Sequence, residues 1–174
     1  PQGKHYDYEA ESKVFAVFTG IEGVDISNNL LGFADIRAES IHYSYDNKML
    51  TGNTRDDGSV CGFGGCYYNR PADRSDKHQE MSARLGLETN NEGVNYFAQT
   101  SLGFRPPQIN EAYRLQKKQT VSDLGSEKLT MFEIGSRFDF NLINGSISFY
   151  KSKKKNSIFR DSENFIIDKG KTNH

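Results

Sequence analysis

The segment YFAQTSLGFRPPQINEAYRL, Tyr96–Leu115, decides the fold because it contains a long β-strand that ends at two prolines. Mostly apolar side chains occupy every second position over residues 96–104, and only Phe97 breaks the pattern. A period of two predicts a strand with one apolar face and one polar face. Pro106 and Pro107 lack the backbone N–H that a sheet ladder requires, so we expect the strand to end there and a loop to follow.

The same alternation recurs in segments 35–39, 81–87 and 132–140. Their apolar positions are Ile36 and Ala38; Met81, Ala83, Leu85 and Leu87; and Phe132, Ile134, Phe138 and Phe140. The opposite positions carry full charges near mid-strand. Strands of about ten residues or more are longer than the five or six typical of soluble sheets. The sequence therefore predicts an all-β protein with six or seven long strands.

The expected connections alternate between short and long. Short turns are predicted at Asn141–Gly145, where Asn-Gly favours a tight hairpin, at Thr89–Gly93 and at Gly23–Asn29. Long polar connections are predicted over residues 46–78, over 106–126 and from Lys153 onward. Residues 109–117 have helical spacing, which predicts one or two helical turns with a packing role inside the second long connection.

This asymmetry is typical of an antiparallel up-and-down transmembrane β-barrel with long extracellular loops and short periplasmic turns. Compact soluble domains rarely contain such long loops without secondary structure. The mean hydropathy of -0.72 and the lack of an apolar run of about 18 residues argue against a helical membrane protein. A balanced charge of -1 argues against a nucleic-acid partner.

Two cysteines, Cys61 and Cys66, lie in the sequence CGFGGC. The intervening glycines allow the chain to fold back tightly, which favours a local disulfide and an oxidising compartment. Zinc binding is the alternative, but two thiolates with no nearby histidine or second cysteine pair make an incomplete site, and the closest histidine is His78. The run Lys153–Lys155 is expected to be a solvated loop or strand end.

An ordered set of short motifs resembles the C-terminal barrel region of TonB-dependent outer-membrane receptors. The matching residues are Phe104-Arg105-Pro106, Leu124, Glu127, Glu133, Gly135, Phe149-Tyr150 and Gly170-Lys171-Thr172. The resemblance is dense from Gly103 to His174, and Arg37–Glu39 and Arg84–Gly86 fit more loosely. Each motif is weak by itself, whereas their order and spacing together are specific.

The resemblance implies one part of a barrel of 22 strands, with the plug domain and the remaining strands outside these 174 residues. The start at Pro1 and the end at KGKTNH also suggest an excerpt. The whole protein would lie in the bacterial outer membrane and contact its lipid. It would import a scarce nutrient, most commonly an iron–siderophore complex, or else haem, cobalamin or a glycan. Energy would come from the TonB complex through the N-terminal region.

The candidate ligand or lumen residues form two groups. Those on the charged strand faces are Arg37, Glu39, Arg84, Glu133, Arg137 and Asp139, and those near the outer rim are Arg105, Glu111 and Arg114. The expected roles are structural: cross-strand pairs that hold the register and contact the plug for the first group, and hydrogen bonds to loop carbonyls for Arg105 and Arg114. Ligand contact is the alternative. Tyr43, Tyr45, Tyr67 and Tyr68 are expected in an interfacial girdle, with ligand stacking as the alternative. Asp56, Asp57, Asp73 and Asp76 are expected to form turns rather than a calcium site.

Two other functional classes remain open from the sequence. A soluble all-β binding module with a disulfide-bearing loop is the main alternative. An enzyme is not expected, because no nucleophile–base pair, phosphate-binding glycine loop or metal-hydrolase motif is present, and no cofactor or metal is expected.

Overall fold

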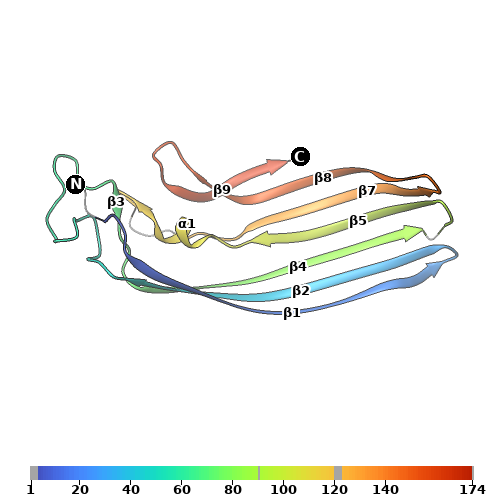
Figure 1. Cartoon of the computed structure of the whole chain (residues 1–174), viewed down its shortest axis with the longest axis horizontal. Coiled ribbons are helices and arrows are strands. Elements are labelled where there is room, and N and C mark those ends of the chain that lie inside the picture. Colours follow the sequence, from blue (N-terminus) through green and yellow to red (C-terminus); the bar gives the residue numbers. More distant parts are fainter. Residues whose placement is uncertain (1–3, 90, 120–122, 174) are drawn as a thin grey trace.

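The computed structural model describes residues 4–89, 91–119 and 123–173, and its main feature is one seven-stranded antiparallel sheet (Figure 1). The strands are β1 (Tyr8–Ser27), β2 (Leu30–Asn47), β4 (Arg74–Thr89), β5 (Val94–Arg105), β7 (Glu127–Phe140), β8 (Ile143–Arg160) and β9 (Ile166–Asn173). Their order in the sheet is their order in the sequence, so the topology is up-and-down. β1 and β9 are the two edges, and the sheet does not close within the described residues.

The two ends of the sheet differ, as the sequence predicts. At the short-turn end, two or four residues separate β1 from β2, β4 from β5, and β7 from β8. At the long-loop end, residues 48–73 and 106–126 carry a small second sheet of β3 (Tyr68–Asn69) and β6 (Leu115–Gln116), together with the helix α1 (Ile109–Tyr113). Figure 1 shows these loops gathered beyond one end of the long strands.

The two faces of the sheet differ in chemistry. We call the face that carries Asp35, Arg84 and Phe97 the inner face, and the face that carries Leu85 and Leu102 the outer face; the cross-strand register sets both assignments. Leu85 is 60% exposed and Leu102 is 48% exposed. The predicted alternation is therefore confirmed, and its apolar side points out of the structure rather than into a dry core.

The buried core is small and lies on the inner face at the long-loop end. α1 packs there. The Tyr113 ring lies tilted against the Tyr45 ring, with 4.6 Å between the ring centroids, and the Tyr43 hydroxyl donates to the Pro107 carbonyl over 2.9 Å. The prediction that Tyr43 and Tyr45 belong to an interfacial girdle is wrong, because both rings are buried beneath α1. The helix itself and its packing role are confirmed, although the helix ends at Tyr113.

Two of the predicted turns are shorter than expected, and each lies at one end of its predicted range. The turn between β7 and β8 is formed by Asn141 and Leu142, with Asn141 at φ 40°, and Gly145 pairs with Phe138 inside the ladder. A Cβ atom on Gly145 would lie 2.7 Å from the Phe138 ring. This glycine is therefore needed for packing, not for the turn.

The turn between β1 and β2 lies at residues 28–29, with Asn29 at φ 59°. Gly23 lies at a register shift between Ile21 and Val24, where its φ of 67° permits a β-bulge. The glycine thus marks an irregularity in the strand rather than the start of the turn.

The long connection predicted from Lys153 onward is wrong. Lys153–Lys155 lies inside β8 and pairs with both β7 and β9, and only residues 161–165 connect β8 to β9. Cross-strand hydrogen bonds on both sides outweigh the low strand propensity of a lysine run. Among the described residues, helices are too short or too polar to cross a membrane.

Candidate functional site

Inner-face charges are joined across neighbouring strands. Arg84 on β4 bonds Asp35 on β2 at 2.6 Å, and it also lies 3.5 Å from Glu22 on β1. The amide of Gln99 donates to Glu133 over 2.7 Å between β5 and β7. Opposed polar pairs of this kind contribute about 0.2–1 kcal/mol each and fix the register of the sheet.

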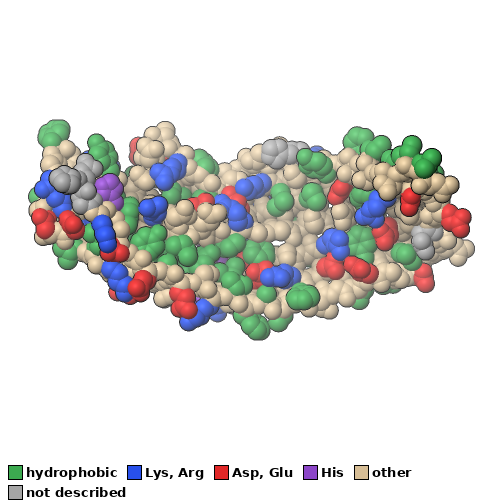
Figure 2. Space-filling view, in the orientation of Figure 1, with side chains coloured by type: hydrophobic (Ala, Val, Ile, Leu, Met, Phe, Trp, Pro, Cys, Tyr) green, Lys and Arg blue, Asp and Glu red, His purple; other side chains and the backbone are tan. Residues whose placement is uncertain are grey.

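The remaining inner-face candidates behave differently from one another. Arg137 reaches Glu88 at 3.0 Å across β5, whereas Arg37 pairs with Glu39 on its own strand. Asp139 forms no ion pair within the part of the chain that the structure describes. Figure 2 shows basic and acidic side chains side by side along the molecule, with hydrophobic ones between them.

Two phenylalanines lie flat over glycines on the inner face. Phe33 is paired with Gly86, and Phe97 is paired with Gly135. A Cβ atom on Gly86 would lie 2.3 Å from the Phe33 ring, so only glycine leaves room for it. Covering a strand glycine with an aromatic ring is a known stabilising device.

An arginine stacks on each of these rings. The guanidinium of Arg84 lies 4.9 Å from the Phe33 centroid, and that of Arg137 lies 4.6 Å from the Phe97 centroid. Phe97 breaks the alternation of its strand because it belongs to this motif. Stacking on these rings holds the guanidinium groups of Arg84 and Arg137 against the inner face, so their positive charges lie along it.

A groove on this inner face brings several candidates together. It has a volume of about 850 Å³, and its lining includes Arg37, Arg84, Asp35 and Glu22. Glu133, Arg137 and Asp139 are not among its lining residues. The groove therefore brings together the candidates Arg37 and Arg84, and it leaves Glu39 and the candidates of β7 apart.

Arg105 joins three elements at the rim. At the end of β5 it bonds Glu127 of β7 at 2.6 Å and Glu111 of α1 at 3.1 Å. Glu111 also accepts from the Gln108 backbone N–H over 2.7 Å, which caps the helix. The expected bonds to loop carbonyls are wrong, because two carboxylates satisfy Arg105. Arg114 instead lies over the Tyr6 ring, 5.5 Å from its centroid.

Tyr113 anchors α1 to the sheet. Its hydroxyl donates to Asp76 over 2.7 Å, and its side chain is fully buried. Burial, and then the hydrogen bond to Asp76, raise the pKa of the Tyr113 hydroxyl above its usual value. The hydroxyl thus stays neutral and keeps donating in alkaline solution. Burial also raises the pKa of Tyr6.

The first long loop is organised by a buried arginine. Arg70 is 1% exposed, and it donates to the carbonyls of Leu50 and Thr54 over 2.7 Å each. Its guanidinium also lies 5.3 Å from the Tyr68 ring centroid. Because a buried charge is tolerated only when its donors are satisfied, these carbonyls are held around Arg70.

The predicted disulfide between Cys61 and Cys66 is confirmed, with a Cα–Cα distance of 5.1 Å. Asn53 fixes the second cysteine from the opposite side of the loop. Its side chain donates to the Cys66 carbonyl and accepts from the Cys66 N–H, both over 2.9 Å. The disulfide and these two hydrogen bonds therefore constrain the shape of the loop around Cys66.

This loop contains a second candidate pocket, of about 680 Å³. Its lining combines cations, carboxylates and aromatic rings, namely His5, Arg55, Lys117, Asp56, Asp57, Phe63, Tyr67 and Tyr68, beside the disulfide. Hydrogen bonds from Ser59 lower the pKa of the Asp57 carboxyl. Tyr67 and Tyr68 are thus in a loop pocket, where a ligand could stack on them, and not at the end of a long strand.

Several of these residues were not predicted from the sequence. Arg55 and Lys117 are far apart in the chain and line the same pocket, next to the pairing of β3 with β6. Arg70 carries no local pattern that marks it as buried. Glu127, the partner of Arg105, could have been predicted as a site residue, because it belongs to the family motif that follows the two prolines.

Comparisons with known proteins agree on the family and the fold. The family described as TonB dependent receptor-like, beta-barrel, matches residues 7–172. The crystal structure of the ferric-catecholate import receptor Fiu of E. coli K12, in its closed form, is similar with a TM-score of 0.70 and 16% sequence identity. The match covers 97% of this chain and 25% of that receptor, so the chain spans about a quarter of its length. No curated protein sequence matches this chain significantly. The chain belongs to the TonB dependent receptor-like β-barrel family.

Proposed function

We propose that residues 1–174 are one part of the barrel domain of a bacterial outer-membrane nutrient receptor. The plug domain and the other strands would belong to the same, longer protein. The observation that carries this proposal is the combination of an exposed apolar outer face and a charged inner face in one sheet. The open edges of β1 and β9 support it too, because hydrocarbon does not tolerate unpaired backbone groups.

The long-loop end would face the outside of the cell and the short turns would face the periplasm, as in other outer-membrane barrels. In this orientation the loop pocket beside the disulfide meets ligands first. The inner-face groove with Arg37 and Arg84 lies further along the lumen wall. Ligand capture would begin in the loops and continue along the charged face.

The chemistry of the loop pocket fits an anionic chelate. Arg55 and Lys117 supply positive charge beside the carboxylates of Asp56 and Asp57, and Tyr67, Tyr68 and Phe63 supply rings for stacking. An iron–siderophore complex is therefore our first candidate, ahead of haem, cobalamin or a glycan. The similar receptor Fiu is described as importing ferric catecholates. Release into the periplasm would need plug rearrangement driven by the TonB complex, and no bond of the ligand would be broken.

The test is uptake of radioactive iron by cells that carry the full-length receptor. Arg55→Gln with Lys117→Gln should weaken apparent affinity roughly 10- to 100-fold, because a hydrogen bond to a charged group is worth about 1.5–3 kcal/mol. Lys118→Gln is the matched control, since this neighbouring lysine does not line the pocket. Uptake should also stop when TonB is deleted. Unchanged affinity in the double variant would reject the loop pocket, and TonB-independent uptake would reject the transport mechanism.

A soluble binding module remains the alternative function. It would leave Leu85, Leu102 and Phe132 in water on one contiguous face, which soluble monomers rarely do. Fractionation separates the two proposals, because the full-length protein should sediment with outer membranes rather than stay in the soluble fraction.

A further inference from the structure

The ladder between β4 and β5 stops before either strand does. Its last pair toward the long-loop end is Ala83 with Leu102, whereas β4 extends back to Arg74 and β5 extends on to Arg105. Over residues 74–82, β4 is therefore paired with β2 but not with β5. A row of free backbone groups of this kind is a ready template for another strand. The strand beside it is the end of β5.

The side chains beyond the ladder complement one another in the continued register. We call residues 80–82 and 103–105 the seam. Continuing the register from Ala83 and Leu102 would pair Ser82 with Gly103, Met81 with Phe104, and Glu80 with Arg105. The first pair is small, the second is apolar and the third is oppositely charged. Pro106 follows, and it has no N–H for a ladder. The sequence therefore suits three further pairs and then a stop.

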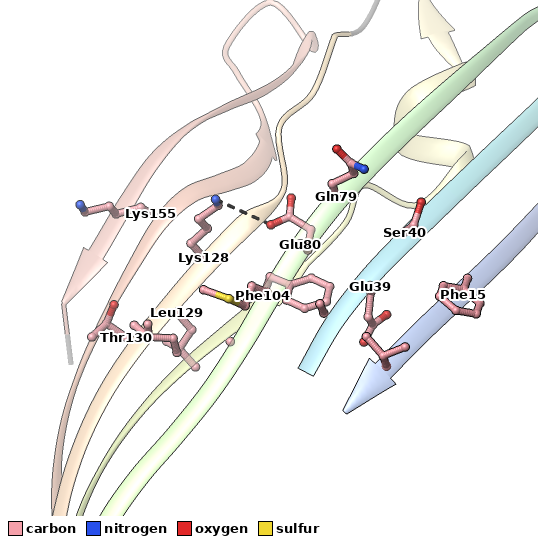
Figure 3. A pocket seen from close by; sticks show the side chains of 15 residues that line it. Phe15, Glu39, Ser40, Gln79, Glu80, Phe104, Lys128, Leu129, Thr130 and Lys155 are labelled. Atoms are coloured by element: carbon pink, nitrogen blue, oxygen red, sulfur yellow. Dashed lines mark ion pairs between the residues drawn. The ribbon is translucent and has the colours of Figure 1, made fainter. Parts of the chain in front are cut away.

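In the structure, the last two residues of β5 are held elsewhere. Phe104 packs against the buried cluster that β2 and α1 form, and Arg105 bonds Glu111 of α1 as well as Glu127 of β7. A hollow of about 680 Å³ lies at the seam, and its lining includes Met81 of β4 and Phe104 of β5 (Figure 3). The helix α1 therefore competes with β4 for the end of β5.

This arrangement leaves Glu80 poorly neutralised. Its side chain is only 10% exposed, and it lies directly opposite Glu39 on the inner face. Like charges opposite each other destabilise a sheet, and a buried carboxylate requires a close partner. Glu39 has Arg37 on its own strand. Glu80 has, within the part of the chain that the structure describes, only Lys128 of β7 as an ion-pair partner, at 3.7 Å (dashed in Figure 3).

We propose that the seam is a two-state switch in which Arg105 exchanges Glu111 for Glu80. In the open state, which the structure shows, Arg105 ties the end of β5 to α1. In the closed state the three further pairs form and Phe104 turns to the outer face. Arg105 then bridges Glu80 and Glu127 across three strands on the inner face. The switch thus links the docking of α1 at the long-loop end to the hollow between β4 and β5.

The experiment measures the rate of disulfide formation in the full-length receptor with Ser82→Cys and Gly103→Cys, in isolated membranes under mild oxidation. These changes leave Phe104 and Arg105 in place, and a Cβ atom on Gly103 meets no atom within 4 Å. The closed state brings the two Cα atoms to about 4.5–5.5 Å, which a disulfide spans. Met81→Cys with Gly103→Cys is the matched control. Its side chains point to opposite faces, so it should react far more slowly.

Two carboxylate changes in the Ser82–Gly103 cysteine pair separate a switch from a static gap. Glu111→Gln removes an open-state partner of Arg105 and keeps the helix cap, so the crosslink should form roughly 1.5- to 5-fold faster. Glu80→Gln removes the closed-state partner and should slow the crosslink by a similar factor.

The inference requires these two rates to change in opposite directions. Changes in the same direction, no change in either variant, or equal rates for the two cysteine pairs would overturn it. Glu80→Asp, with a shorter reach and the same expected slowing, replaces Glu80→Gln if that variant does not fold. Heat-modifiable migration on gels reports folding of each variant.

Discussion

Gly135→Ala should destabilise the sheet although it adds a single methyl group. Gly135 lies on the inner face of β7, opposite Phe97. The new Cβ would lie 2.7 Å from the Phe97 ring and 2.6 Å from the Ile147 carbonyl oxygen. The ring can rotate away, whereas the carbonyl belongs to the ladder between β7 and β8 and cannot move without breaking it.

The expected magnitude follows from three contributions. Overpacking costs about 1–3 kcal/mol, and displacement of Phe97 from Arg137 removes a cation–π contact of about 0.5–1 kcal/mol. The lower entropy of an alanine in the unfolded chain offsets about 0.4–1 kcal/mol. The net loss in the free energy of unfolding is therefore roughly 1–3 kcal/mol.

Urea unfolding of the full-length protein in phosphatidylcholine vesicles measures this loss, with gel migration as the readout. Gly103→Ala is the matched control, because Gly103 is also an inner-face glycine and no atom lies within 4 Å of its new Cβ. The control should be neutral or more stable by about 0.4–1 kcal/mol. Phe97→Leu combined with Gly135→Ala should recover part of the loss. Equal stability of Gly135→Ala and Gly103→Ala would refute the reasoning.

Two further predictions concern the outer face and α1. Leu102→Arg should cost about 2–4 kcal/mol near the bilayer midplane, and Ser101→Arg should cost less; equal losses in the same unfolding assay would contradict the assignment of faces. Tyr113→Phe should lower stability, and the difference from wild type should be largest below about pH 10. Because folding raises the pKa of Tyr113, its contribution to stability is full below the pKa of an unfolded tyrosine. The contribution is lost as the pH rises through the raised pKa of the folded state. Unfolding midpoints between pH 7 and 12 check this, and a gap that widens with pH would contradict it.

The long strands and their two faces could be predicted because an exposed sheet needs no dense core. Each side chain of such a sheet faces one side or the other according to its position in the strand alone. Leu85 and Leu102, which are exposed on the apolar face, are examples. Turn positions were harder to predict. Asn144-Gly145 has the composition of a turn, but the need to accommodate the Phe138 ring places Gly145 in the ladder. Local propensity also failed for Lys153–Lys155, where pairing on both sides decides the structure.

The candidate residues were predicted by charge, whereas their partners depend on register. Sequence alone indicates that Arg84 and Arg137 lie on the polar face, but not that each stacks on a phenylalanine ring. The burial of Arg70 and the place of Lys117 in the loop pocket depend on how the loops pack, and the sequence does not predict that packing. Whether any of these residues contacts a ligand stays a prediction until uptake is measured.

The partial ladder between β4 and β5 has a consequence for how the chain assembles. Six residue pairs join these strands, whereas sixteen join β2 to β4 and twelve join β5 to β7. The ladder between β8 and β9 also has only six pairs, with two register shifts. The described sheet therefore consists of two extensively paired blocks, β1–β2–β4 and β5–β7–β8, with a short ladder between them and another at the β9 edge. Each block can complete its own hydrogen bonding first, and the two short ladders should separate before the long ones when the protein is pulled or heated.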